Sequence, residues 1–224
     1  MITADTLQRF CANDMDERAH LRQPWLVGAW VYACNGHIAV RVPAETMPDA
    51  KPNDKAPDAA ALFKRAIEDA PRDFVPLPEF QRRVACDLCD GTGIVRAIKC
   101  DDCGGEGEFK RGRHVYMCQE CEDSNAGPGH IQLFPHDEPF VGEVIRACRD
   151  CDGLGLDGGA STRVPPVAFG EALYSAAYLT MIDKLPGAKF SAGDAARKNY
   201  EGPRELPAAF VFDGGQGILM PRAS

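Results

Sequence analysis

The sequence has no run of apolar residues long enough for a membrane span, which needs about 18 or more in succession. Its first residues also lack the charged and then apolar layout of a secretory signal peptide. We therefore expect a soluble, cytoplasmic protein with no membrane partner. An excess of basic charge is missing too, because 25 Lys and Arg stand against 33 Asp and Glu, a formal net charge of −8. This balance excludes a protein whose whole surface binds phosphates.

The common catalytic motifs are absent as well. The chain contains no phosphate-binding Walker loop, no His-Glu-x-x-His helix and no Gly-x-Ser-x-Gly elbow. Cys34 and His37 have the spacing of a Cys–His nucleophile across a turn, but a half-buried hairpin cysteine is the better interpretation. We predict that the protein is not an enzyme and has no catalytic residues.

Cysteine, in contrast, is abundant. The chain has 10 cysteines, and eight of them form four Cys-x-x-Cys pairs between positions 86 and 151. The pairs are Cys86/Cys89, Cys100/Cys103, Cys118/Cys121 and Cys148/Cys151. A secreted disulfide scaffold spreads its cysteines along the chain and follows a signal peptide, and neither feature is found here. Eight reduced thiolates at this spacing predict two tetrahedral Zn²⁺ sites per chain.

Three of the four pairs continue into the same glycine pattern. The segments that begin at Cys86, Cys100 and Cys148 each read C-x-x-C-x-G-x-G. Glycine tolerates the backbone angles that turn amide N–H groups toward the thiolates, where such donors stabilise sulfur charge. The segment at Cys118 differs, because its glycines arrive late, at positions 127 and 129. The repeat as a whole predicts zinc knuckles.

This repeat resembles the cysteine-rich domain of DnaJ-type co-chaperones, which has four such motifs and two zinc ions. The resemblance covers roughly a third of the chain. It implies a nested pairing, in which the first and fourth motifs share one ion and the second and third share the other. The two implied ligand sets are Cys86, Cys89, Cys148 and Cys151, and Cys100, Cys103, Cys118 and Cys121.

Three features depart from that family. The glycines of the third motif are late, and the 26 residues between Cys121 and Cys148 make a long connection. Sequential pairing, first with second and third with fourth, therefore stays open as an alternative. The His-Pro-Asp motif of J-domains is also missing, since Pro135-His136-Asp137 has the wrong order. Recruitment of an Hsp70-type ATPase by the usual route is not expected.

Other metal-ligating side chains lie near the cysteines. We interpret the histidines at 114, 130 and 136 as solvated loop residues, because eight cysteines already complete two sites. The acidic side chains of Asp101-Asp102, Glu120 and Glu122-Asp123 are interpreted as solvated loop charge.

Ordinary globular patterns flank the cysteine region. Before it, we predict a helix capped by Thr3, a hairpin with Asn35-Gly36 at two positive φ angles, and a helix from Asp58 to Ala70. After it, the apolar spacing predicts a helix of about four turns over 169–185 and a final hairpin over 210–221. Neither flank alone offers many strands.

The economical interpretation is an α+β fold in which the two flanks form one domain. We assign residues 1–85 and 164–224 to this discontinuous domain and residues 86–159 to an inserted, glycine-rich, two-zinc domain of hairpins. The segment Tyr32 to Val40, the expected helix before Pro186-Gly187, and the ending Gly217 to Arg222 resemble parts of a bacterial sliding-clamp domain. The resemblance implies a small clamp-like α/β domain.

The net charge of the cysteine region indicates which kind of partner it can bind. Between positions 86 and 151 there are 7 Lys and Arg against 13 Asp and Glu, a net charge of −6, and eight thiolates with two Zn²⁺ ions bring it near −10. Such a field repels phosphates, so a protein partner has better support than nucleic acid. The one local exception is the basic segment Lys110 to His114, which nested pairing places at the tip of a loop.

Two hypotheses from different classes follow. The first is a non-enzymatic zinc-binding adaptor, a clamp-like platform with a two-zinc arm that docks on a protein in a replication- or phage-related setting. The second is a chaperone-like or thiol–disulfide-active zinc protein that acts on unfolded polypeptide. We expect a compact insert with few exposed apolar residues, which favours the first.

Overall fold

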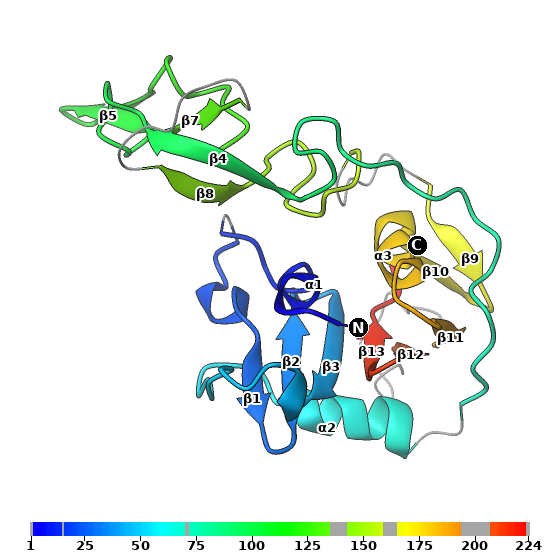
Figure 1. The fold of residues 1–224 in the computed structure, drawn as a ribbon. Helices are drawn as coiled ribbons and strands as arrows, with labels where there is room; N and C mark the ends of the chain where they lie inside the picture. The colour runs from blue at the N-terminus through cyan, green and yellow to red at the C-terminus, as the bar shows by residue number, and fades with distance from the viewer. Residues whose placement is uncertain are drawn as a thin grey trace. The chain divides into compact units, whose positions relative to one another are not determined.

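The structure is a computed structural model that describes residues 2–14, 16–69, 72–134, 143–158, 165–193 and 207–222. The chain divides into two compact units. The host unit comprises Met1–Ala12, Asp16–Arg83 and Thr162–Ser224, and the cysteine unit comprises Asn13–Met15 and Val84–Ser161. Helices and several small sheets make the fold α+β, as predicted (Figure 1).

A six-stranded antiparallel sheet organises the host unit. Its strands are β1 (Trp25–Val27), β2 (Trp30–Cys34), β3 (Ile38–Pro43), β11 (Lys189–Ser191), β12 (Ala208–Phe212) and β13 (Gly215–Leu219). Their order is β1-β2-β3-β13-β12-β11, and β3 pairs with β13, with Val40 opposite Gly217. Strands from both flanks of the cysteine region therefore lie in one sheet.

Helices cover this sheet because their apolar faces match its buried side chains. Helix α2 (Ala59–Phe63) starts at Asp58, whose side chain accepts a hydrogen bond from Ala61 N–H, and continues into a π-helical turn, η3 (Lys64–Glu68). Phe63 packs edge-on against Tyr32 at a centroid distance of 5.5 Å. The short helices are α1 (Ala4–Gln8), capped by Thr3 as predicted, and the 3₁₀ turns η1 (Ala19–Leu21) and η2 (Ala44–Thr46).

Two local predictions in the host unit are wrong. The segment expected to be one helix over 169–185 begins as a hairpin, β9 (Val167–Phe169) and β10 (Ala172–Tyr174), and only then forms helix α3 (Ala176–Asp183). Gly170, at φ +62°, turns the chain between the two strands. The spacing of Phe169 and Leu173 fits a helix and a tight hairpin equally well, and the glycine decides between them.

The second wrong detail is the turn between β2 and β3. Only Gly36 has a positive φ, at +89°, so Asn35 does not adopt the second positive angle that was expected. Asn35 instead accepts hydrogen bonds at its side-chain oxygen from the N–H groups of His37 and Ile38, at 3.0 and 3.1 Å. Its side chain thereby fixes the turn, and Gly36-His37 becomes the central pair. The closing hairpin, β12 to β13, forms as predicted.

The described residues of the cysteine unit form two small antiparallel sheets. One has the order β7-β4-β8 and consists of β4 (Ile94–Lys99), β7 (His130–Leu133) and β8 (Val144–Ala147). The other is the two-stranded hairpin β5 (Glu108–Arg111) and β6 (His114–Met117). All strands here are short, and their neighbours in space are the four Cys-x-x-Cys segments.

Candidate metal centres

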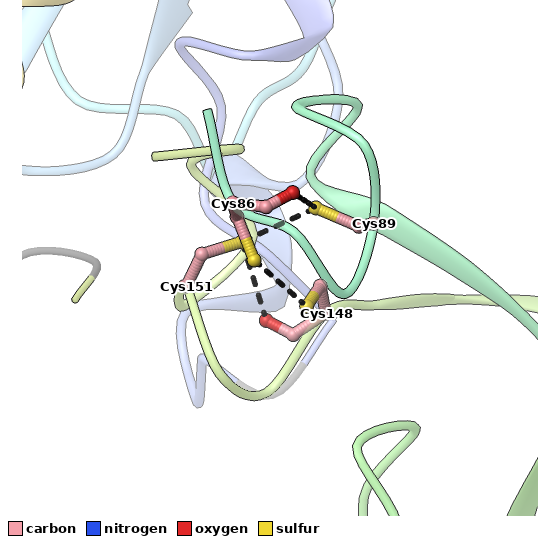
Figure 2. A group of neighbouring side chains, drawn as sticks. All are labelled: Cys86, Cys89, Cys148 and Cys151. Carbon is pink, nitrogen blue, oxygen red and sulfur yellow. Dashed lines mark hydrogen bonds between the residues drawn. The ribbon is translucent and has the colours of Figure 1, made fainter. Parts of the chain in front are cut away.

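The eight paired cysteines gather into two groups of four. One group is Cys86, Cys89, Cys148 and Cys151, and the other is Cys100, Cys103, Cys118 and Cys121. Within each group the sulfur atoms all lie within 4.8 Å of one another. Figure 2 shows the first group, whose four sulfurs point toward a common centre. The cysteines thus adopt the nested grouping and not the sequential alternative.

The sulfur separations test whether a metal fits. Across the first group, Cys86 and Cys148 Sγ lie 4.0 Å apart and Cys89 and Cys151 Sγ lie 3.7 Å apart. In the second group the corresponding distances, Cys100 to Cys118 and Cys103 to Cys121, are 3.7 and 3.8 Å. Four thiolates bound tetrahedrally to Zn²⁺ at about 2.3 Å have sulfurs about 3.8 Å apart. Both groups therefore match the dimensions of a Cys₄ zinc site.

Three of the four Cys-x-x-Cys segments are tight turns closed by the same backbone hydrogen bond. Gly91 N–H donates to Cys86 O at 3.0 Å, Gly105 N–H to Cys100 O at 3.1 Å and Gly153 N–H to Cys148 O at 2.9 Å. In these three motifs the residue after the second cysteine adopts a left-handed conformation, with φ of +49° at Asp90, +63° at Gly104 and +52° at Asp152. Asp is among the few non-glycine residues that adopt this region readily.

A backbone amide then faces one sulfur of every motif. The donors Gly93, Gly107, Gly129 and Gly155 each lie 3.2 Å from Sγ of Cys89, Cys103, Cys121 and Cys151, respectively. In three motifs the donor is four residues after the cysteine, and in the third it is eight residues after. The late glycines of the third motif therefore serve the same role, with four additional residues between the ligand and its amide donor.

Backbone hydrogen bonds between motifs explain the nested grouping. Cys86 N–H donates to Gly155 O at 3.1 Å, and Cys148 N–H donates to Gly93 O at 2.9 Å. In the second group, Cys100 N–H donates to Gly129 O and Cys118 N–H donates to Gly107 O, at 2.9 and 3.0 Å. Each motif thus bonds reciprocally to its partner, so the pairing is encoded in the backbone as well as in the sulfurs.

The close approach of paired motifs requires glycine. A Cβ atom at Gly93 would lie 2.2 Å from Gly153 O, and one at Gly155 would lie 2.3 Å from Gly91 O. A Cβ at Gly129 would lie 2.2 Å from Gly105 O. These contacts are to backbone atoms that cannot rotate away. The glycine pattern read from the sequence is therefore a packing requirement in addition to a conformational one.

Electrostatics at the sulfurs favour a bound cation. Burial raises the pKa of the Cys86 thiol to about 11 and of the Cys121 thiol to about 12. At Cys103, burial also opposes ionisation, but the N–H groups of Gly107 and Gly105 lower the pKa to about 7. Four buried thiolates repel one another unless a metal neutralises them, and Zn²⁺ binds such ligands as thiolates. The four-sulfur donor set suits Zn²⁺, which would hold the knuckles together and leave no open coordination position.

Two residues far away in the sequence support the first centre. Asn13 Nδ2 donates to Asp152 O at 2.9 Å, and Ala147 N–H donates to Asp14 Oδ1 at 3.1 Å. Asp14 also pairs with Arg146, with Nη1 3.0 Å from Oδ2. Asp152 and Ala147 lie directly beside the candidate ligands Cys151 and Cys148. Sequence reasoning missed Asn13 and Asp14, because they belong to no motif and precede the first ligand by about 70 positions.

The remaining candidate ligands lie outside both groups. His114 and His130 lie on strands β6 and β7 and not in loops, while His136 falls outside the described residues. The acidic candidates are exposed, namely Asp101, Asp102, Glu120, Glu122 and Asp123.

The two cysteines outside the four pairs have raised pKa values. Cys34 Sγ accepts a hydrogen bond from Gly36 N–H at 3.1 Å, and burial raises the pKa of this thiol, which disfavours a thiolate nucleophile there. Burial raises the pKa of Cys11 to about 12.

The expectation of few exposed apolar residues in the cysteine unit is wrong. Nine of the 12 large hydrophobic side chains that are exposed among the described residues belong to this unit. They are Val84, Leu88, Ile94, Phe109, Val115, Tyr116, Met117, Phe134 and Ile145. Short strands around two cysteine groups leave little interior, so apolar side chains stay on the surface.

No family model matches the sequence, and no curated protein and no solved structure matches it either. Among the described residues, no helix has the length and apolar character that a membrane crossing requires.

Proposed function

We propose that the cysteine unit holds two structural Zn²⁺ ions and acts as a non-enzymatic protein-docking arm. The observation that carries the proposal is the pair of closed four-sulfur groups, with sulfur separations of 3.7 to 4.0 Å. Four protein ligands leave no position for a catalytic water, which is typical of structural zinc. The repeat that resembles the DnaJ-type cysteine-rich domain supports the same role.

Exposed apolar side chains support docking on protein. A unit that exposes nine large hydrophobic side chains among its described residues carries surface of the kind that contacts partners. The net charge of −6 between positions 86 and 151 disfavours a polyanion over most of this surface. We therefore propose a protein partner that presents a complementary apolar surface.

The second candidate is a chaperone-like activity on unfolded polypeptide. It gains support from the same exposed residues, because scattered apolar side chains bind unfolded chains without a specific fit. A thiol–disulfide activity has less support, since sulfurs that share a metal are not free for exchange.

For the host unit we propose a clamp-like domain in a replication- or phage-related setting. Two of the segments with that resemblance overlap β3 and β13, which pair in the central sheet. An affinity pull-down that recovers replication proteins with the host unit would support this setting.

The test combines a metal count with two binding assays. We expect two zinc ions per chain by elemental analysis, and a zinc-dependent pull-down of one or a few defined proteins. Suppression of aggregation of many unrelated denatured proteins, without a defined partner, would favour the chaperone-like alternative. One zinc per chain, or cysteines in disulfides under reducing conditions, would overturn the metal assignment itself.

A further inference from the structure

The hairpin β5–β6 is the most exposed element of the cysteine unit. Every residue on its two strands is at least partly exposed, and seven of the eight are exposed. A two-stranded ribbon alone is only marginally stable in water. This one is held at its base, because Cys118 N–H donates to Gly107 O at 3.0 Å and Cys118 belongs to the second metal centre. The fold thus presents a ribbon that supports no core of its own.

One face of this ribbon consists entirely of planar side chains. The register places Phe109 opposite Tyr116 and Arg111 opposite His114, so these four residues share a face. Phe109 is 43% exposed and Tyr116 is 53% exposed, and the His114 and Tyr116 rings lie 6.4 Å apart. Two aromatic rings, an imidazole and a guanidinium therefore line one surface.

The opposite face has a different character. It carries Glu108, Lys110, Val115 and Met117, of which Val115 and Met117 are 54% and 47% exposed. Lys110 Nζ lies 3.3 Å from Glu108 Oε1 and is partly neutralised by it. The two faces are thus equally accessible, but only one offers flat rings.

Charge is concentrated at the tip of the ribbon. Positions 109 to 116 contain Lys110, Arg111 and Arg113 and no acidic residue, whereas the exposed Asp101, Asp102, Glu120, Glu122 and Asp123 belong to the knuckles at its base. A short anionic segment at the tip is attracted there. A longer polyanion that extended over the base would be repelled.

We propose that this planar face binds single-stranded nucleic acid over a short segment. Two bases stack on Phe109 and Tyr116, and the adjoining phosphates contact Arg111 and Arg113. Aromatic side chains interleaved with cations are the surface that binds single strands, because every base offers a flat face to a ring. Paired bases in a duplex expose no such face, so single strands are favoured. The cations and the absence of acidic residues at positions 109 to 116 favour an anionic ligand of this kind over a purely apolar protein surface.

The proposal rests on a metal-loaded second centre, so the experiment uses the full-length zinc protein with its metal content measured first. Fluorescence anisotropy of labelled oligo(dT), oligo(U) and a DNA duplex gives the affinities at low salt. We expect single strands to bind more tightly than the duplex, and the first two probes to separate DNA from RNA. Contacts from Arg111 and Arg113 to two phosphates give a slope of about −1.4 in a plot of log affinity against log salt, at about −0.7 per phosphate for a single strand.

The decisive variant is Phe109→Ala with Tyr116→Ala. Loss of two stacked bases should weaken binding by at least about 25-fold. Val115→Ala with Met117→Ala is the matched control, because it trims similarly exposed side chains on the other face and should leave affinity unchanged. Tyr116→Phe keeps the ring and should also bind, and every variant should retain two zinc ions.

Three outcomes would overturn the proposal. The first is that a protein with two zinc ions binds no single strand. The second is that the control variant and the aromatic variant lose equal affinity, and the third is that the duplex binds as tightly as single strands. If the aromatic variant instead loses a protein partner and no oligonucleotide binds, the ribbon is a protein-docking surface. If the protein lacks the second zinc ion, the metal count shows this before any binding assay. A failure of the proposed metal centre is therefore distinguished from a failure of nucleic-acid binding.

Discussion

The two units of this chain bury different kinds of side chain. In the host unit the largest fully buried side chains are aromatic, among them Trp25, Tyr32, Phe63 and Phe210. In the described part of the cysteine unit no aromatic side chain is buried, and the buried residues are the eight cysteines with small clusters of Val, Ala and Leu. Apolar burial can stabilise the first unit alone. The second has too little of it, so we expect its stability to depend on the proposed zinc ions.

The largest expected effect is therefore that of zinc removal. A structural Zn²⁺ contributes about 10–16 kcal/mol to folding in zinc-finger peptides, so chelation should unfold the cysteine unit. The host unit should stay folded. Both tryptophans, Trp25 and Trp30, lie in the host unit, so their fluorescence reports on that unit alone.

Amide hydrogen exchange on the metal-free protein checks this prediction. Positions 86–134 and 143–158 should lose protection while the tryptophan unfolding transition is unchanged, and added Zn²⁺ should restore protection. Protection that survives chelation would show that the metal is not what stabilises the unit.

The next largest effect separates the two centres. Cys100→Ser with Cys103→Ser should release the second ion and loosen the β5–β6 hairpin, leaving one zinc per chain on the first centre. Cys148→Ser with Cys151→Ser should release the first ion and loosen both ends of the cysteine unit. The reciprocal backbone bonds, such as Cys86 N–H to Gly155 O, are the reason that each centre fails separately.

NMR spectra of the two double variants show which cysteines become disordered, and so distinguish nested from sequential sharing of the ions. If the change at Cys148 and Cys151 disorders Cys118 and Cys121 and spares Cys86 and Cys89, the ions are shared sequentially in solution and the nested grouping is wrong.

Spacing made the eight candidate ligands predictable from sequence, whereas their nested grouping followed from the resemblance to the DnaJ-type domain. A Cys-x-x-Cys pair with glycines close behind it describes one local turn, so three of the four knuckles could be recognised from eight residues. The location of Lys110 to His114 at a hairpin tip followed from the nested scheme, and the structure places the turn there, between β5 and β6. The caps at Thr3 and Asp58 were equally local.

Features that depend on distant contacts were not predictable. Nothing at Asn13 or Asp14 indicates that they bind the backbone beside Cys151 and Cys148. The helix expected over 169–185 was wrong because Phe169 and Leu173 fit two periodicities. The exposure of Phe109 and Tyr116 could not be foreseen either, because an apolar residue in a sequence does not show whether a core exists to bury it.

One glycine substitution in each unit tests whether close packing there supports zinc binding or the stability of the host unit. Gly93→Ala adds a Cβ 2.2 Å from Gly153 O at φ +81°, and Gly217→Ala adds one 1.9 Å from the ring of Phe210. The first should weaken zinc binding at the first centre without changing tryptophan unfolding. The second should lower the free energy of unfolding of the host unit by about 2–3 kcal/mol and leave two zinc ions bound.

Gly214→Ala is the control for the second change. It also lies in the closing hairpin, at φ +91°, but nothing lies within 4 Å of its Cβ, so only backbone strain of about 1–2 kcal/mol is added. Equal effects at positions 214 and 217 would show that the Phe210 contact is unimportant.

The smallest expected effect is a pH dependence confined to the host unit. A side-chain hydrogen bond from Arg18 holds the pKa of Asp16 at about 2, below its ordinary value of 3.8. Arg18 Nε and Nη2 donate to the two carboxylate oxygens at 2.9 and 2.7 Å, and Arg18 also donates to Asn35 O in the β2–β3 turn. Because the Arg18 side chain is 42% exposed, water screens the pair, and its contribution is about 1 kcal/mol.

The sign follows from the lowered pKa. Asp16 binds its proton more weakly in the folded state, so the stabilisation is complete above about pH 4 and is lost as the pH falls from 4 toward 2. Asp16→Asn should therefore unfold more easily than the unsubstituted protein at pH 7, by about 1 kcal/mol in urea titrations followed by tryptophan fluorescence. The difference should shrink between pH 4 and 2. Glu17→Gln, next in sequence, is the control and should show no such difference. A gap between Asp16→Asn and the unsubstituted protein that persists at pH 2 would assign the effect to packing and not to the ion pair.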